Sequence, residues 1–324
     1  NTSAKLDNEY MAIKASGYKL SQVTSKDGYV IVNYKNIIDY YNSVDVNADI
    51  DFEKDSAQMV KENIVKEKNP KGLRPSIEAG FHSILDKYVI HTHSVYANVL
   101  CCTENGIDLV KNIFSAGEYD WLWIPYVLPG FSLTLEIQKK AIEYYEKNGK
   151  RPNIIFMENH GLIVTAPNAK ECVSLNEKVN NKIREYQGIN EPYPQIIING
   201  IDSSTFMSGT KYLNQFFKGN GNIDNDYFTP ILYPDQVVYL NPDFIAINSS
   251  SDKVNINTHT GEVMYRCGQG EARTIDETLT AYIYIREQIE KHNLKMKPMT
   301  PEKVSTITGM EAESYRKKIL NTMK

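Results

Sequence analysis

Short strand-like runs alternate with helical patterns along the first 187 residues, and this alternation constrains the fold more than any other feature. The strand-like runs stand at 10–15, 28–34 and 88–93, the last of them β-branched. The segments with apolar residues at helical spacing are 76–86, 131–148 and 168–187. Strands that alternate with helices form a sheet with covered faces, so the pattern predicts an α/β sandwich around a central sheet.

The remaining segments complete this outline and predict a division of the chain near residue 188. "NIIFMENHGLIVTAP" at 153–167 predicts two strands that meet at a polar turn around Glu158–Gly161. A polar helix or lid is expected at 52–68. Residues 188–231 are rich in Gly, Asn and Ser, which favours a linker or an irregular excursion.

The last part of the chain carries shorter patterns. Strand-like runs stand at 235–249 and 253–266, followed by helical patterns at 273–293 and 301–322. The apolar runs "VVYL" and "FIAI" are too short to form an independent core. We therefore expect two domains, a catalytic domain over 1–187 and a smaller α+β extension over 188–324 that packs on it.

The charge, the apolar runs and the cysteines of the chain limit the kinds of partner and compartment that we expect for it. The net charge of −4 gives no reason to expect nucleic acid or an anionic membrane. The uncharged run "WLWIPYVL" at 121–128 is far shorter than the roughly 20 residues that cross a bilayer. The four cysteines fit neither a zinc knuckle nor a disulfide framework. Together with the lack of a signal-peptide pattern, this predicts a cytoplasmic protein with reduced, mostly buried cysteines.

Two histidines in "YVIHTH" are the first candidates for a functional site. Side chains two residues apart in a strand point to the same face, so His91 and His93 would present their imidazoles side by side. His160, in the turn "MENHGLIV", offers a third. Three neutral imidazoles leave an open position on Zn²⁺, as catalytic zinc sites do. The pair alone is a weak signal for a metal and is more often two histidines at the edge of a core strand.

The order of the motifs resembles the class II aldolase/adducin family, typified by zinc-dependent fuculose- and rhamnulose-phosphate aldolases. Over residues 1–187 the motifs that carry the resemblance are "NTS" at 1–3, "IKASG" at 13–17, "PSIEAGFH" at 75–82, "HTH" at 91–93, "IPYVLPG" at 124–130 and "NHGLIV" at 159–164. The resemblance implies a three-layer α/β/α sandwich with a central mixed, mainly antiparallel sheet. Residues from 188 onward resemble the aldolase part of two-part sugar aldolase–dehydrogenase proteins. Because no G-x-G-x-x-G loop follows, we expect no dehydrogenase half.

The same resemblance implies roles for the candidate residues. His91, His93 and His160 would hold Zn²⁺, or another divalent metal such as Mn²⁺ or Co²⁺. Glu78 would act as the base at carbon and as a ligand of the resting metal, and Tyr126 as the acid, reaching a neighbouring subunit's site. A glutamate in the first turn of a helix is also favoured by the helix dipole alone, and any one of 22 tyrosines is by default a packing residue. We expect a structural role for His82.

Small polar residues of the matched loops would surround a phosphate. They are Asn1, Ser3, Ser16, Gly17 and Ser76. Free backbone N–H groups and a helix N-terminus suit an anion. The simple aldolases carry a second serine where this chain has Ile77, which leaves room for an unphosphorylated or acidic substrate. Lys14 would add a positive charge, although a lysine at a strand edge is more often solvated.

The resulting expectation is a lyase that cleaves a ketose 1-phosphate by a retro-aldol reaction to dihydroxyacetone phosphate and an aldehyde. The alternatives are a sugar-phosphate 4-epimerase with the same metal site and a non-catalytic adducin-like scaffold, with decarboxylases and dehydratases also open. We expect a homotetramer with sites at subunit interfaces. The cluster at 119–130 is rich in Trp and Tyr, and its run 121–128 carries no charge. This favours an interface, but a buried edge strand would look the same.

Overall fold

The computed structural model describes residues 1–114, 117–250 and 253–310, which divide into two compact units. The first unit comprises Asn1–Cys101 and Gly106–Tyr186. The second comprises Cys102–Asn105 and the residues from Gln187 onward. In the described part of the chain, every helix is too short or too polar to span a lipid bilayer.

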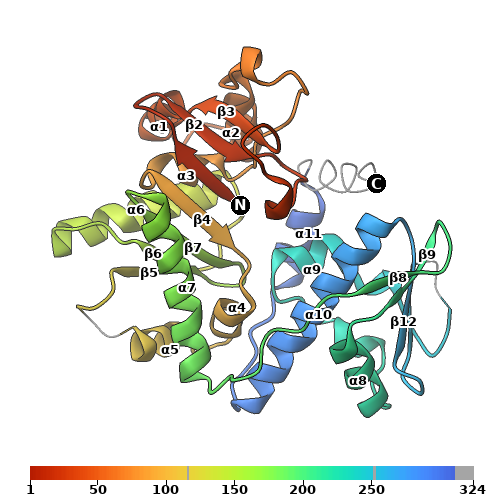
Figure 1. Ribbon diagram of the computed structural model, residues 1–324. Coiled ribbons are helices and arrows are strands. Elements are labelled where there is room, and N and C mark those ends of the chain that lie inside the picture. Colours follow the sequence, from red (N-terminus) through yellow and green to blue (C-terminus); the bar gives the residue numbers. More distant parts are fainter. Residues whose placement is uncertain (115–116, 251–252, 311–324) are drawn as a thin grey trace. The chain divides into compact units, whose positions relative to one another are not determined.

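The first unit is built on one mixed sheet (Figure 1). Within the described residues its strands are β1 (Thr2–Lys5), β2 (Tyr10–Lys14), β3 (Tyr29–Asn33), β4 (Tyr88–Thr92), β5 (Trp121–Ile124), β6 (Ile154–Met157) and β7 (Gly161–Ala166). Their order is β3-β2-β1-β4-β7-β6-β5. The pair β5–β6 is parallel and the other neighbours are antiparallel. The prediction of a mixed, mainly antiparallel central sheet is confirmed.

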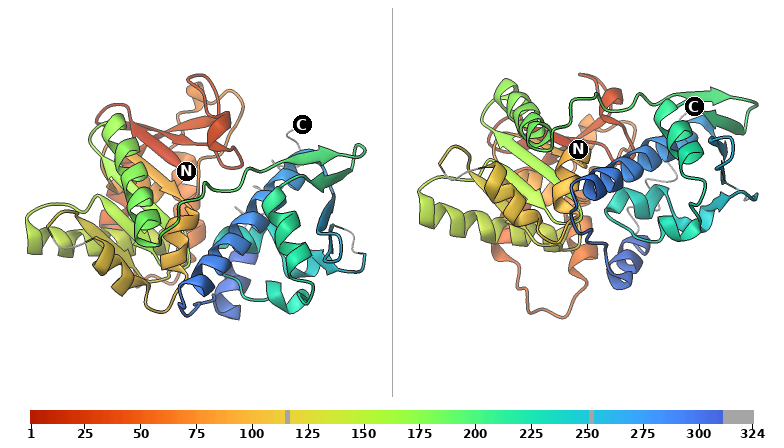
Figure 2. Two further views of the ribbon diagram at one scale, coloured as in Figure 1. Left: turned by 60° about the horizontal axis from the view of Figure 1, so that its bottom comes forward. Right: turned by 90° about the horizontal axis from the view of Figure 1, so that it is seen from below.

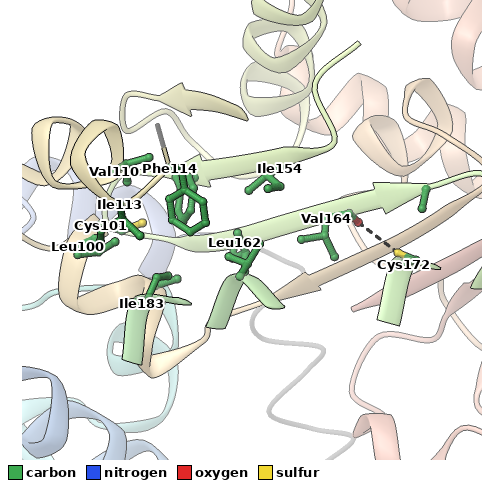
Figure 3. Close-up of a cluster of buried hydrophobic side chains, with 14 residues drawn as sticks. Leu100, Cys101, Val110, Ile113, Phe114, Ile154, Leu162, Val164, Cys172 and Ile183 are labelled. Atoms are coloured by element: carbon green, nitrogen blue, oxygen red, sulfur yellow. Dashed lines mark hydrogen bonds between the residues drawn. The ribbon is translucent and has the colours of Figure 1, made fainter. Parts of the chain in front are cut away.

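Buried side chains alternate between the two faces of this sheet. On β6, Ile154 and Phe156 belong to a cluster with helices α4 (Val95–Cys101), α5 (Gly106–Ile113) and α7 (Ala169–Tyr186) (Figure 3). Ile155 and Met157 belong to a cluster with α3 (Ala79–Ile84) and α6 (Phe131–Asn148). Because side chains alternate along a strand, both faces are covered and the first unit has three layers.

The helices α1 (Tyr34–Ser43) and α2 (Phe52–Glu62) share a buried cluster with the strands β2 and β3 and with the starts of α3 and α6. Glu53 of α2 accepts hydrogen bonds from the backbone N–H groups of Phe131 at 2.7 Å and Ser132 at 3.0 Å. A carboxylate at a helix N-terminus satisfies orphan donors and favours the helix dipole. Glu53 thus fixes the start of α6 and the end of the loop that carries Tyr126. Short 3₁₀ turns at Leu20–Gln22 and Lys66–Lys68 complete the unit.

The second unit is an α+β assembly with its own sheet (Figure 2). Within the described residues its strands are β8 (Ile198–Gly200), β9 (Thr205–Ser208), β10 (Ile245–Ile247), β11 (Val254–Asn257) and β12 (Glu262–Arg266), in the order β10-β11-β12-β9-β8. The long helix α10 (Gln269–Lys291), blue in Figure 2, packs against β8 and β9. The other elements are α8 (Lys211–Gly219), α9 (Pro234–Tyr239), α11 (Pro301–Thr308) and 3₁₀ turns at Asn225–Phe228 and Pro242–Phe244. The α+β character predicted for this part of the chain is confirmed.

Two expectations for this unit are wrong. The run predicted as a strand from 235 begins as the helix α9, because Pro234 occupies its first position and Val237 and Val238 pack inward. A short apolar run does not by itself distinguish a strand from a buried helix. The stretch 188–231, predicted to be irregular, contains β8, β9 and α8. Of the helix expected at 301–322, the structure shows α11, and residues 311–322 lie outside the described residues.

Candidate metal centre

The three candidate histidines gather at one edge of the central sheet. His91 belongs to β4, His93 follows its end, and His160 lies in the turn between β6 and β7. Since β4 pairs with β7 so that Thr92 faces Leu162, the turn before β7 lies beside the residues after β4. One ligand atom from each histidine lies within 4.8 Å of the others. The ring centroids are 5.0–5.1 Å apart. The predicted side-by-side arrangement is therefore present.

Two backbone features of the β6–β7 turn bring His160 to this place. Asn159 has a φ of 50°, a left-handed conformation that asparagine tolerates better than most residues. A Cβ on Gly161 would lie 2.4 Å from the Thr92 carbonyl oxygen, so only glycine permits this close approach of β7 to β4. The turn residues thus fix the spacing between His160 and the histidines of β4.

Glu78 adds a carboxylate to the three histidines. It occupies the position directly before α3, and its side chain is buried. Its Oε1 lies 3.2 Å from Nε2 of His91 and 3.3 Å from Nε2 of His160. Its Oε2 accepts hydrogen bonds from the Asn1 amide at 3.3 Å and the Ser76 hydroxyl at 3.4 Å. One carboxylate oxygen therefore faces the imidazoles, and two polar side chains orient the other.

The protonation of these groups follows from their surroundings. Burial lowers the pKa of His91 to about 4. Burial alone would raise the pKa of the Glu78 carboxyl, but the adjoining imidazoles of His91 and His160 hold that pKa well below its ordinary value. At neutral pH the cluster thus offers a neutral imidazole at His91 and an ionised carboxylate at Glu78.

This donor set fits a divalent cation. Nδ1 of His91 lies 3.1 Å from the Leu162 carbonyl oxygen, so Nδ1 carries the hydrogen and Nε2 keeps a lone pair. That buried Nε2 faces Oε1 of Glu78 at 3.2 Å with no hydrogen available between them. Two ligands each about 2.0–2.1 Å from a tetrahedral Zn²⁺ lie about 3.3 Å apart. The observed separations match that value, and a cation between the two atoms removes their repulsion.

The expected phosphate-binding loops lie next to each other. The backbone N–H of Ser16 donates to the Arg74 carbonyl at 2.8 Å, and Ala15 forms a bridge with Pro75, directly before Ser76. Gly17 has a φ of 84°, which favours glycine. The two segments that the sequence places about 60 residues apart are thereby joined.

The Lys14 ammonium closes the turn that carries Ser16 and Gly17. It donates to the carbonyl oxygens of Ala15 at 3.0 Å and Tyr18 at 2.6 Å. The side chain is therefore engaged with the loop backbone and is not a freely solvated lysine at a strand edge.

The Ser3 side chain contacts His82 of α3. Its hydroxyl lies 2.8 Å from Nδ1 of His82, and both side chains are buried. Burial lowers the pKa of His82 well below its ordinary value, so this imidazole is neutral. His82 also stacks on Phe81 with ring centroids 4.8 Å apart. The pair ties β1 to α3.

Tyr126 lies two residues beyond β5 in a half-buried loop. Because β5 runs parallel to β6 and the Glu158 N–H donates to the Ile124 carbonyl at 2.9 Å, the chain after β5 leaves the sheet at the edge where His160 lies. Burial raises the pKa of the Tyr126 phenol to about 12, so it carries its proton at neutral pH. β5 is an edge strand, and the indole N–H of Trp121 donates to the Phe114 carbonyl.

Sequence reasoning missed the groups that orient the site through backbone atoms. The Leu162 carbonyl sets the tautomer of His91, and no side-chain pattern signals such a contact. Cys101, noted only as a buried cysteine, contacts both neighbours of His160. The pairing of β4 with β7 was needed to find either group.

The solved structures that match part of this chain share little sequence with it. The N-terminal class II aldolase domain of a conserved protein from Thermoplasma acidophilum is 20% identical, with a TM-score of 0.46, and the match covers 57% of this chain and 82% of that one. An L-fuculose 1-phosphate aldolase is 20% identical with a TM-score of 0.36, and the match covers 59% of this chain and 77% of that one.

Among curated proteins, the uncharacterized oxidoreductase YuxG of Bacillus subtilis (strain 168) is 31% identical over 114 residues. That match covers 35% of this chain and only 15% of the relative's length. The model of the family "Class II Aldolase and Adducin N-terminal domain" matches residues 1–186, more than half of the chain. On this match, and with three histidines at the sheet edge, the chain belongs to the class II aldolase and adducin N-terminal domain family.

Proposed function

We propose that this chain is a metal-dependent lyase that cleaves a ketose 1-phosphate, or a related sugar, to dihydroxyacetone phosphate and an aldehyde. One observation carries the proposal. His91, His93 and His160 bring a ligand atom each within 4.8 Å of one another, beside the buried carboxylate of Glu78. The adducin-like scaffold, which needs no such cluster, does not account for it.

The three histidines would hold the metal, with Glu78 as a further ligand in the resting state. Zn²⁺ is our choice, because three imidazoles leave it an open position for substrate; Mn²⁺ and Co²⁺ are the alternatives. When bound, the metal supplies a Lewis acid for the carbonyl and hydroxyl oxygens of the substrate.

The protein side chains would handle the protons. In the condensation direction the ionised Glu78 would take a proton from the carbon that attacks the aldehyde, and Tyr126 would donate its phenol proton to the aldehyde oxygen. Cleavage is the reverse of these steps, with the hydroxyl proton passing to the Tyr126 phenolate and the protonated Glu78 returning its proton to the carbon. The hydrogen bonds from Asn1 and Ser76 to Oε2 hold the carboxylate in one orientation, which leaves Oε1 directed toward the reacting centre.

The substrate's anionic group would lie at the joined loops of Ser16–Gly17 and Ser76, together with Asn1, directly before β1, and Ser3 in β1. The contact between the Ser16 N–H and the Arg74 carbonyl supports this grouping. Ile77 follows Ser76 and is half-buried. It offers no hydrogen bond from its side chain, so the cradle has one hydroxyl fewer than the family pattern.

A homotetramer with Tyr126 completing a neighbour's site is part of the proposal. If so, Tyr126→Phe and Glu78→Gln chains, each nearly inactive alone, regain part of the activity when assembled together, since a mixed interface restores one intact site. Sedimentation gives the oligomeric state. A fully active monomer, or no recovery in verified mixed assemblies, contradicts this arrangement.

The decisive experiment combines metal analysis with a substrate panel. We expect about one equivalent of zinc per purified chain and loss of most of it in His93→Ala. Ketose 1-phosphates incubated with the metal-loaded protein should yield dihydroxyacetone phosphate and an aldehyde. Recovery of a C4 epimer instead would identify a 4-epimerase. Full metal occupancy in His93→Ala would refute the ligand assignment.

A further inference from the structure

The helix α4 connects two of the proposed metal ligands. It begins directly after His93 and Ser94, and it ends at Cys101. At its start, the Ser94 hydroxyl hydrogen bonds to Asn180 of α7, and the Asn98 N–H donates to the Ser94 carbonyl at 2.8 Å. The end of the helix that follows His93 is therefore anchored to the neighbouring helix.

At its other end, α4 holds the turn that carries His160. The Cys101 carbonyl accepts a hydrogen bond from the Asn159 N–H at 2.9 Å. The Cys101 thiol donates to the Gly161 carbonyl, with sulfur and oxygen 3.6 Å apart. One residue of α4 thus contacts the residue before His160 and the residue after it. On its other side, Gly161 is pressed against Thr92 and His93, where no Cβ would fit.

We propose that Cys101 is a positioning residue for the metal centre, because its thiol holds the β6–β7 turn and thereby fixes His160 relative to His93. The inference rests on the proposed metal site, and it assigns the thiol a role that a merely buried cysteine does not have. Burial raises the pKa of the Cys101 thiol, so the group remains a protonated donor. A thiol–carbonyl contact is weak, so its effect is on the placement of the ligand.

A second cysteine provides a matched control. Cys172 on α7 is buried like Cys101 and belongs to the same hydrophobic cluster (Figure 3). Its thiol also lies within donating distance of sheet carbonyls, that of Tyr88 on β4 at 3.5 Å and that of Val164 on β7 at 3.6 Å. Figure 3 shows the two cysteines at opposite ends of the cluster. They differ in that Cys101 contacts both neighbours of His160, whereas Cys172 contacts Tyr88 and Val164, which lie several residues from the histidines along β4 and β7.

The test compares Cys101→Ala, Cys101→Ser and Cys172→Ala in the full chain. Co²⁺ is the probe, since its ligand-field absorption reports the geometry of the ligands, and a competing chelator gives its affinity. Removing a group that orients a ligand typically costs about 10–100-fold in metal affinity. We expect about 10-fold weaker Co²⁺ binding and an altered spectrum for Cys101→Ala. Cys101→Ser, which keeps a donor, should recover most of the affinity.

Cys172→Ala should lower the thermal unfolding temperature about as much as Cys101→Ala but leave the Co²⁺ spectrum and affinity at wild-type values. Identical Co²⁺ spectra and affinities for the two alanine variants would overturn the proposal, even if both are destabilised. If wild-type protein binds no Co²⁺ or Zn²⁺, the metal site itself is refuted and Cys101 has no ligand to position. The two failures therefore give different results.

Discussion

Among the described residues, each unit of the molecule buries one carboxylate, and the two are treated in opposite ways. Glu78 in the first unit faces Nε2 atoms of His91 and His160. Asp276 on α10 of the second unit is 0% exposed and accepts hydrogen bonds from the hydroxyls of Thr210 at 2.6 Å and Tyr265 at 2.7 Å. Imidazoles hold the pKa of Glu78 well down, whereas burial raises the pKa of Asp276.

The difference separates a candidate site from a structural connection. The hydroxyls around Asp276 are donors, and each of them links a different element, the corner before α8 or the strand β12, to α10. The groups that face Oε1 of Glu78 are imidazole nitrogens. In His91 the ring hydrogen is on Nδ1, which donates to the Leu162 carbonyl, so Nε2 presents a lone pair to Oε1. Buried polar groups that satisfy one another stabilise a fold, while buried lone pairs that converge on one point call for a cation.

The strongest test of this comparison replaces each carboxylate with the neutral amide of the same shape. We expect Glu78→Gln to keep the fold and to lower turnover of the ketose 1-phosphate substrate about 10²–10⁴-fold, as loss of a general base typically does. Asp276→Asn should retain near wild-type turnover. Steady-state kinetics on the substrate from the panel measures both. Near wild-type turnover in Glu78→Gln would show that this group is not the base.

The second prediction is that loss of the Asp276 carboxylate lowers the stability of the protein and leaves its metal content unchanged. Asp276→Ala leaves the buried Tyr265 and Thr210 hydroxyls without their acceptor, so we expect the free energy of unfolding to fall by about 2–3 kcal/mol. Metal content, which depends on the first unit, should not change. Denaturant unfolding and metal analysis of the same sample provide the two readings. Tyr265→Phe, which removes one of the donors, is the control and should cost less.

An unchanged unfolding midpoint in Asp276→Ala would mean that water replaces the carboxylate. In that case the second unit would not differ from the first in the way described above, and the contrast between the two carboxylates would rest on the metal site alone.

The smallest expected effect is on the pH dependence of stability. Burial raises the folded-state pKa of Asp276 above its ordinary 3.8, against the opposing effect of its hydroxyl donors. The folded state therefore binds this proton more tightly than the unfolded state does. The resulting stability is fully present below pH 3.8 and is lost as the pH rises through the folded pKa. Because the hydroxyl donors offset part of the effect of burial, we expect a smaller change than in Asp276→Ala.

Comparison with Asp276→Asn isolates this contribution, because asparagine does not titrate while the other groups are unchanged. The stability of the wild type relative to the variant should decline as the pH rises from about 3 to about 7. A relative stability that increases over this interval would show that the hydroxyl donors outweigh burial.

The sequence alone determined the parts of the protein that depend on local periodicity. The helix predicted at 131–148 is α6 to the residue, because its apolar spacing agrees with its start after Gly130 and its end at Gly149, which has a φ of 71°. The strand spacing of His91 and His93 likewise predicted adjacent imidazoles, since side chains in a strand alternate without help from tertiary contacts.

Local pattern was insufficient where burial sets the conformation. The run from 235 fits a strand and a buried helix equally well, and α9 forms because its apolar side chains pack inward. The strands β8 and β9 are short and lie in a stretch rich in Gly, Asn and Ser, so the pairing of β9 with β8 and β12 could not be seen along the chain.

Only the tertiary structure decided how distant residues share one site. Glu78 and His160 are far apart in the sequence, yet Oε1 and Nε2 lie 3.3 Å apart. The pairing of β4 with β7 and the glycine that permits their close approach place His160 beside His91 and His93, and Cys101 contacts the turn that carries it. A sequence records which side chains are available, but hydrogen bonds between backbone atoms, which are the same for every residue, decide where those side chains meet.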